Sequence, residues 1–110
     1  MRILVVSDTH GDLRSLIKAV DAQRKAEIIV HCGDGEEQQR FLKDNYKDKM
    51  IVAVRGNCDW NSFFPSKEIF KVCGKTIFVT HGHLYDAKSG LYRITSAARE
   101  AGADILLFGH

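Results

Sequence analysis

Residues 3–12 read Ile-Leu-Val-Val-Ser-Asp-Thr-His-Gly-Asp, and this segment organises the rest of the chain. Its apolar run, Ile3 to Val6, has the length of one buried strand. Because side chains two residues apart in a strand point to the same face, we expect Asp8 and His10 to converge if the extended conformation continues through Thr9. A carboxylate oxygen and an imidazole nitrogen that converge form a candidate pair of metal ligands.

Length and composition indicate a single globular domain. The chain has 110 residues, of which 45% are hydrophobic, and that is enough to bury a core. The net charge of +2 is too small to indicate nucleic acid as a partner, and the lysines of residues 43–49 are interspersed with aspartates, as on a solvated surface.

The cysteines and the start of the chain predict the compartment. Cys32, Cys58 and Cys73 show no C-x-x-C spacing, which favours a reducing compartment over a disulfide framework. We interpret Cys32 and Cys73 as packing residues. The apolar run after Arg2 is far shorter than a signal-peptide core or a membrane span. We therefore expect a cytoplasmic protein without a membrane partner.

Apolar periodicity predicts strands and helices that alternate through the first half of the chain. Strands are expected at 3–6, 26–31 and 50–54, and helices at 13–24 and 36–46. This alternation is typical of an α/β fold with a parallel sheet. In the second half, the segments 67–72 and 75–80 flank Cys73-Gly74 and predict an antiparallel hairpin. A helix at 91–101 and a strand at 104–108 complete the chain.

Five of the expected strands end in a polar cluster. The clusters are Asp8-Thr9-His10, Gly33-Asp34, Gly56-Asn57, His81-Gly82-His83 and Gly109-His110. In open α/β sheets, ligands bind beyond the carboxyl ends of the strands. The donors are carboxylates, imidazoles and one amide, so the set suits Mn, Fe, Zn or Ni better than a structural cysteine-type zinc.

These motifs, in this order and over the whole chain, resemble those of the calcineurin-like metallophosphoesterases, and most closely the small bacterial and archaeal phosphodiesterase branch. The matching motifs are Asp8-Thr9-His10-Gly11, Gly33-Asp34, Gly56-Asn57-Cys58-Asp59, Thr80-His81-Gly82-His83 and Gly109-His110. The resemblance implies an α/β/β/α sandwich with a dinuclear centre of divalent metal ions, manganese being favoured.

The resemblance also implies a role for each matching residue. Asp8 and His10 bind the first metal, and Asp34 bridges both. The second metal is bound by Asn57, His81 and His110. Of the two histidines around Gly82, the family pattern favours His81 as the direct ligand and places His83 beside the substrate or behind a ligand.

The chain departs from the family pattern at its end. In the family the last motif reads Gly-His-x-His, and its second histidine completes the first metal site, whereas this sequence stops at His110. The family's sandwich also contains further strands and a C-terminal extension. We therefore expect residues 1–110 to be one metallophosphoesterase domain that is truncated at its C-terminus and lacks roughly a third of the usual length.

The activity implied by the resemblance is hydrolysis of phosphate esters by a hydroxide that bridges the two metals. In the phosphoprotein phosphatase branch, a histidine after the Gly-Asn pair is linked to protonation of the leaving group, and here that position is Cys58. A thiol is a poor match for an alkoxide, so small or nucleotide-like phosphodiesters are favoured as substrates. His83 and Asp59 are candidates for the acid, and Asn57 is a candidate for orienting the substrate.

Two other functions stay open at this point. One is a phosphomonoesterase, including a phosphoprotein phosphatase, and the other is a protein-binding scaffold without activity, as in a subunit of the eukaryotic retromer coat. A retired site usually loses ligands, whereas every ligand position within this chain is filled, which favours the enzyme. The sequence does not indicate an oligomeric state.

Several of the residues named above also have structural readings. Asp8 and Asp34 are possible helix caps, and Asn57 is a possible turn residue. His31 is expected to be a core histidine and not a ligand, because its strand already supplies Asp34. The aromatic residues Trp60, Phe63 and Phe64 either cover the core, which we favour slightly, or form a wall beside the substrate.

Overall fold

The computed structural model describes residues 1–60 and 62–109. The elements in chain order are β1 (Ile3–Val6), α1 (Leu13–Ala22), β2 (Ile28–His31), α2 (Glu36–Asn45), β3 (Met50–Ala53), β4 (Lys67–Val72), β5 (Lys75–Thr80), the 3-10 turn η1 (His83–Tyr85), α3 (Tyr92–Glu100) and β6 (Ile105–Leu107). The order of strands and helices predicted from apolar periodicity is confirmed.

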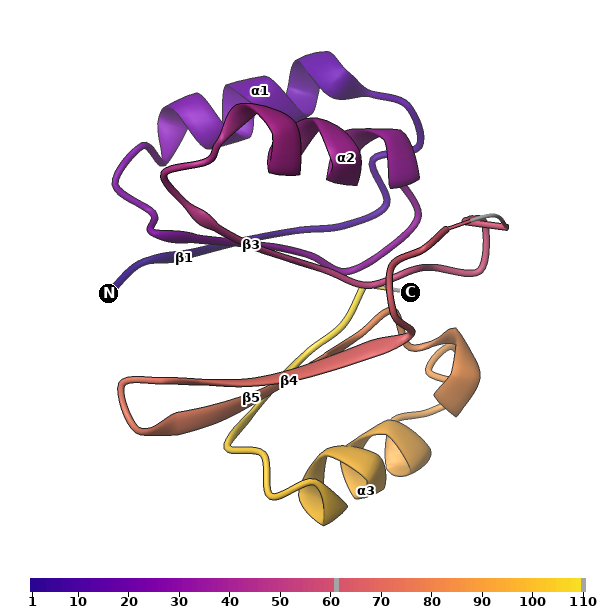
Figure 1. Ribbon diagram of the computed structural model, residues 1–110. Helices are drawn as coiled ribbons and strands as arrows, with labels where there is room; N and C mark the ends of the chain where they lie inside the picture. The colour runs from indigo at the N-terminus through magenta and orange to yellow at the C-terminus, as the bar shows by residue number, and fades with distance from the viewer. Residues whose placement is uncertain (61, 110) are drawn as a thin grey trace.

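Four layers build the molecule, as Figure 1 shows. Helices α1 and α2 cover a parallel sheet with the strand order β1-β2-β3. A second sheet, with the order β4-β5-β6, faces the first and is covered on its outer side by α3. In this second sheet β4 and β5 are antiparallel, while β5 and β6 are parallel. The predicted α/β/β/α sandwich is therefore confirmed.

The main core lies between the two sheets. Ile28, Val30 and Val52 from the first sheet pack with Ile77 and Val79 from the second. On the other face of β2, Ile29 packs with Leu16, Val20 and Leu42 beneath the helices. Because successive side chains point to opposite faces, β2 buries both of its faces, and its sequence is correspondingly apolar throughout the strand interior.

The turn between β4 and β5 confirms the predicted hairpin and corrects one packing assignment. Cys73 and Gly74 both have left-handed backbones, with φ of 51° and 78°, as a two-residue hairpin of primed type requires. This places Cys73 at the exposed tip of the hairpin, so the expectation that it packs in the core is wrong. Cys32 is buried, as expected.

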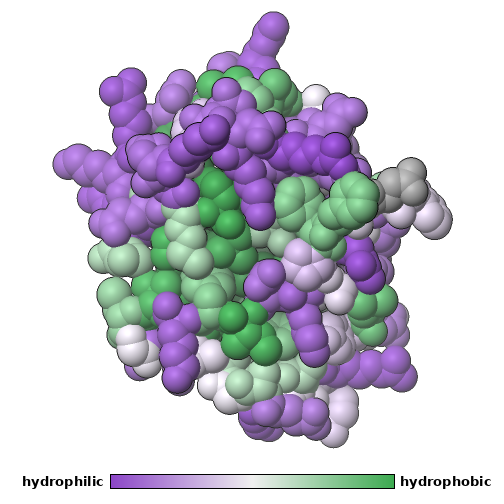
Figure 2. Space-filling view, in the orientation of Figure 1, coloured by the Kyte–Doolittle hydropathy of each residue, from purple (hydrophilic) through white to green (hydrophobic). Residues whose placement is uncertain are grey.

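The surface also corrects the reading of the aromatic residues. Trp60 is 89% exposed and Phe63 is 93% exposed, so neither covers the core. Phe64 is half-buried, with the Lys43 ammonium 5.1 Å from its ring centroid. Figure 2 shows further apolar side chains at the surface between the polar helix layer and the lower part of the molecule. Within the described residues, no helix has the length and apolar character needed to cross a membrane.

Candidate metal centre

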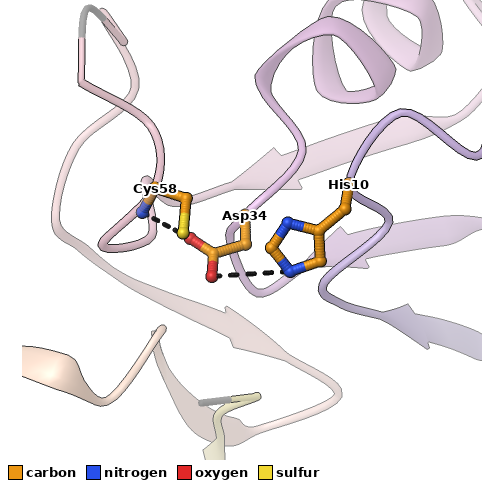
Figure 3. A group of neighbouring side chains, drawn as sticks. All are labelled: His10, Asp34 and Cys58. Carbon is orange, nitrogen blue, oxygen red and sulfur yellow. Dashed lines mark hydrogen bonds and ion pairs between the residues drawn. The ribbon is translucent and has the colours of Figure 1, made fainter.

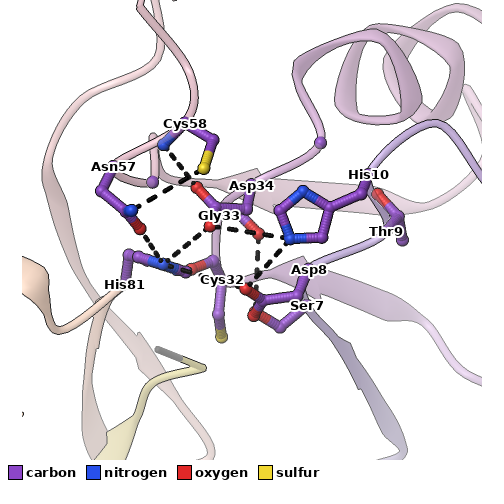
Figure 4. A network of polar contacts seen from close by, with 12 residues as sticks. Ser7, Asp8, Thr9, His10, Cys32, Gly33, Asp34, Asn57, Cys58 and His81 are labelled. Carbon is purple, nitrogen blue, oxygen red and sulfur yellow. Dashed lines mark hydrogen bonds and ion pairs between the residues drawn. The ribbon is translucent and has the colours of Figure 1, made fainter. Parts of the chain in front are cut away.

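The loops that follow β1, β2 and β3 meet at one edge of the parallel sheet. Backbone hydrogen bonds join the first two loops, because the Asp8 N–H donates to the Gly33 carbonyl at 2.8 Å and the His10 N–H donates to the Asp34 carbonyl at 3.1 Å. His81, which directly follows β5, enters the same place from the second sheet (Figure 4). Asp8, His10, Asp34, Asn57 and His81 are thus brought together, as the sequence predicts.

The convergence of Asp8 and His10 has a different cause from the one expected. Strand β1 ends at Val6, so strand alternation does not carry through Thr9. Instead Asp8, His10 and Asp34 all have left-handed backbones, with φ of 55°, 42° and 63°. Such conformations are uncommon outside glycine and are retained mainly where the surrounding structure and a function require them. The directions of the Asp8, His10 and Asp34 side chains are therefore set by tight turns and not by strand alternation.

Two groups of potential ligand atoms share the Asp34 carboxylate. One group joins His10, Asp34 and Cys58, and the other joins Asp8, Asp34 and His81. Within each group the ligand atoms lie within 4.8 Å of one another. Figure 3 shows the first group, with the His10 ring and the Cys58 side chain on either side of the Asp34 carboxylate. The resemblance pairs Asp8 with His10 and does not include Cys58, so the thiol is a donor that sequence reasoning missed.

The distances in these groups fit a cation between the ligands. His10 Nε2 lies 3.6 Å from Asp8 Oδ1 and 3.8 Å from Asp34 Oδ2, which is too long for a direct hydrogen bond. Two ligand atoms that each lie about 2.1 Å from one tetrahedral ion are separated by about 3.4 Å. The separations around His10 are close to this value.

The contacts of the two His81 ring nitrogens show where a cation or a proton fits. Nδ1 lies 2.7 Å from the Cys32 carbonyl, which only accepts, so Nδ1 donates this hydrogen bond (Figure 4). Nε2 lies 2.9 Å from Asn57 Oδ1 and 3.2 Å from Asp34 Oδ2. A ring nitrogen between two oxygen acceptors holds either a proton or a metal ion at that point. A backbone carbonyl that fixes the far nitrogen is also the usual support of a metal-binding histidine.

Asp34 is held ionised at the centre of the cluster. Burial opposes its charge, but the Cys58 N–H, which donates to Oδ1 at 2.8 Å, and the nearby His81 ring outweigh that cost and lower the pKa of the carboxyl. Gly56 permits this approach, because a Cβ at that position would overlap the Asp34 carboxylate. The glycine of the Gly56-Asn57 motif is therefore required by the position of Asp34.

Asp59 lies beneath the cluster and accepts four backbone N–H groups. Its Oδ2 accepts from Asp34 at 2.9 Å and Gly56 at 2.8 Å, and its Oδ1 accepts from Gly35 at 3.1 Å and Glu36 at 3.2 Å. The residue is only 8% exposed. Both oxygens are thus engaged as acceptors, which favours a positioning role over the proton-donor role that the sequence suggests.

His31 joins all three loops from inside the core. Its Nδ1 accepts from the Gly33 N–H at 3.1 Å and the Gln39 amide at 3.0 Å, so the proton of the ring is on Nε2, which donates to the Thr9 hydroxyl at 3.0 Å. Thr9 in turn donates to the Gln38 side-chain oxygen, and the Gln39 amide also donates to the Val54 carbonyl. Burial lowers the pKa of His31 to about 4, so the ring is neutral at pH 7. His31 is a core residue, as expected, but its bonds to the ligand loops were not foreseen.

The remaining predicted site residues have different positions. The His83 ring lies beside that of His81, with 5.6 Å between the centroids, and does not line the cavity next to His10. The Cys58 thiol is exposed, and partial desolvation together with the charge of Asp34 raises its pKa, which keeps it protonated at neutral pH. His110, the sixth predicted ligand, lies outside the described residues.

Two proteins of known family are similar to this chain in sequence. The chain is 34% identical, over 114 residues, to the probable metallophosphoesterase YsnB of Bacillus subtilis, and the match includes all of this chain and 63% of that protein. A phosphodiesterase of Methanocaldococcus jannaschii, MJ0936, is 26% identical over 131 residues, which include all of this chain and 72% of the relative.

Solved structures show the same fold. A predicted phosphoesterase of Streptococcus pneumoniae superposes with a TM-score of 0.81 at 30% identity, covering 98% of this chain and 60% of that one. The Vps29 protein of Cryptosporidium parvum, at 19% identity and a TM-score of 0.78, shows the fold alone, with 98% of this chain and 63% of that one covered. This chain therefore spans about three fifths of the length of several relatives that it matches.

The family assignment rests on the whole chain. The model of the calcineurin-like phosphoesterase superfamily domain matches residues 1–110, the full length of the sequence. All five ligand loops inferred from the sequence lie within that match. The chain belongs to the calcineurin-like phosphoesterase superfamily.

Proposed function

We propose that the protein hydrolyses phosphodiesters with the help of two divalent cations bound at the edge of the parallel sheet. The observation that carries the proposal is the sharing of Asp34 by two groups of ligand atoms. One carboxylate between two such groups is the arrangement by which a protein holds two metals close together. Membership of a phosphoesterase superfamily supports the reaction class.

In this proposal Asp8, His10, Asp34, Asn57 and His81 hold the cations, with His110 as a further ligand. The cations would acidify a water molecule and neutralise the charge of the phosphate. The carboxylates and imidazoles suit manganese, which we favour, and also iron, zinc or nickel.

The residues of the chain orient and protonate the substrate. Asn57 is exposed, with its Oδ1 turned toward His81 and its Nδ2 donating to Cys58 Sγ at 3.7 Å, and in this proposal that amide would donate to a phosphate oxygen. His83, behind His81, is the proposed proton donor, since both oxygens of Asp59 are engaged by backbone N–H groups. Cys58, in place of a stronger acid partner, favours diesters with good leaving groups over monoesters. The phosphodiesterase name of the M. jannaschii relative supports this preference.

A test combines metal content with turnover. The protein, loaded with Mn²⁺, is expected to bind two cations and to hydrolyse bis(p-nitrophenyl) phosphate faster than p-nitrophenyl phosphate. Asp34→Asn should lose at least one cation and reduce kcat/KM by about 10³-fold or more, because the shared carboxylate is lost.

Asp12→Asn is the matched control. Asp12 caps α1 by accepting from the Ser15 N–H at 3.1 Å, and asparagine caps a helix equally well. If Asp34→Asn keeps both the metal content and the turnover of the Asp12→Asn protein, the enzyme proposal is wrong. Such a result would favour the scaffold function that stays open for this fold.

A further inference from the structure

We propose that the cleft beside the metal group binds one organic arm of the diester, as an uncharged aromatic ring stacked on Trp60. This inference rests on the proposed phosphodiesterase function and names its substrate class. The cleft has a volume of about 380 Å³ and opens directly onto His10, Asp34 and Cys58. Its other walls include Trp60 and the first turn of α2. A phosphate held at the metal group would therefore direct one of its two ester groups into this cleft.

Trp60 gives the cleft a stacking surface. The Trp60 side chain is 89% exposed, so it contributes little to the core, and it lines the cleft, where a ligand could cover it. A planar ring that stacks on it contributes about 1–3 kcal/mol, with little dependence on the identity of the ring. This favours aryl or nucleoside esters over small alkyl esters.

Two of the N–H groups at the N-terminus of α2, which also lines the cleft, are not available to a second phosphate. The N-terminus of a helix is ordinarily a site for anions, because its first N–H groups lack partners. Here the N–H groups of Gly35 and Glu36 already donate to the Asp59 carboxylate, at 3.1 and 3.2 Å. An anionic group in the cleft would find these donors occupied by another carboxylate.

The first turn of α2 adds further negative charge. Glu36 and Glu37 both line the cleft. The Glu36 carboxylate pairs with Arg40 at 2.6 Å, whereas Glu37 has no cationic partner among the residues that the structure describes. The cleft therefore discriminates against an ester arm that carries its own phosphate or carboxylate, and an uncharged ring avoids this repulsion.

The first test measures binding and does not need turnover. Titration calorimetry compares diphenyl phosphate with dimethyl phosphate on the Mn²⁺-loaded protein. We expect diphenyl phosphate to bind about tenfold more tightly, Trp60→Ala to abolish the difference, and Trp60→Phe to retain most of it. Trp60 is the single tryptophan of the chain, so diphenyl phosphate should also change the intrinsic fluorescence, whereas dimethyl phosphate should not.

The second test concerns charge. Phenyl 4-carboxyphenyl phosphate should bind more weakly than diphenyl phosphate. Glu37→Gln should reduce the ratio of the two dissociation constants by about threefold. Glu100→Gln, on α3 at the far side of the molecule, is the matched control and should leave this ratio of dissociation constants unchanged.

The two proposals fail in different ways. The cleft proposal would be overturned if the unaltered protein bound diphenyl and dimethyl phosphate with equal affinity. It would also be overturned if Trp60→Ala preferred diphenyl phosphate as strongly as the unaltered protein does. Neither result would affect phosphodiesterase turnover. Absence of turnover with every diester would overturn the proposed function, while Trp60-dependent binding of diphenyl phosphate would still support the cleft.

Discussion

The two sheets contribute to the candidate metal centre in different ways. The parallel sheet supplies three loops that are tied to one another by buried side chains, with His31 and Asp59 as the two hubs. His81, which directly follows β5 of the second sheet, is oriented by contacts of its ring with the first sheet's loops, at the Cys32 carbonyl, Asn57 Oδ1 and Asp34 Oδ2. The three loops of the parallel sheet thus hold one another in place, whereas His81 from the second sheet packs against them. Changes in the two regions should accordingly separate folding from metal binding.

The largest effect is expected from Asp59→Ala, which removes the acceptor of four backbone N–H groups. Each buried donor left without a partner costs about 1–3 kcal/mol, so we expect the free energy of unfolding to fall by about 4 kcal/mol or more and the metal affinity to fall with it. Urea titration and metal analysis measure the two quantities. Asp59→Asn, which keeps one oxygen, should be intermediate, and a loss below about 1 kcal/mol in Asp59→Ala would contradict the positioning role.

His81→Ala tests the contribution of the second sheet, where we expect metal binding to be affected more than folding. The variant removes a proposed ligand together with the ring contacts to Cys32, Asn57 and Asp34, so the bound metal should fall from two ions to one and kcat/KM by about 100-fold or more. Stability in the absence of metal should change far less than in Asp59→Ala. A variant that unfolds as readily as Asp59→Ala would show that His81 belongs to the same organised unit as the first three loops.

A smaller effect on the free energy of unfolding is expected when the pH is lowered, because of the buried His31. Burial lowers the pKa of the folded residue from 6.5 to about 4, so between these values the unfolded chain binds a proton that the folded chain does not. The free energy of unfolding should therefore fall, by up to about 3 kcal/mol, as the pH drops from 6.5 towards 4. Asp34, with its lowered pKa, acts in the same direction at still lower pH.

Urea titrations at neutral and mildly acidic pH measure this slope. His31→Gln should be less stable at neutral pH and should show a shallower dependence. His10→Gln is the control, because His10 is exposed and takes no part in the buried network. An unchanged slope in His31→Gln would show that another group titrates.

The sequence predicted the strands, the helices and the five residues that meet at the candidate metal centre, because apolar periodicity and strand-end placement are local signals. It did not predict how Asp8 and His10 converge, since the left-handed turns depend on the bonds between the loops after β1 and β2. The roles of His31 and Asp59 were missed for the same reason. Asp59 bonds backbone N–H groups up to 25 residues away, and His31 bonds two side chains as well as a backbone N–H, and no residue pattern records which distant group a buried side chain will meet.

Trp60 and Phe63 show a related limit. Aromatic residues usually pack, and their place after the Gly56-Asn57 motif gives no sign of whether the loop folds inward or outward. In the structure both side chains are exposed, and Trp60 lines the cleft beside the candidate metal centre.

The smallest and most specific effect is expected at Cys58, whose exposed thiol accepts from the Asn57 amide at 3.7 Å and lies beside the Asp34 carboxylate. Cys58→His places a stronger acid partner next to Asp34, so hydrolysis of p-nitrophenyl phosphate should rise several-fold relative to bis(p-nitrophenyl) phosphate. Cys58→Ser should leave that ratio low, because a hydroxyl is no better a proton donor. Cys73→Ser, at the tip of the β4–β5 hairpin, is the control for loss of an exposed thiol. A ratio that rises equally in Cys58→Ser would show that the thiol limits monoester hydrolysis by its bulk or by binding a cation, and not by its acidity.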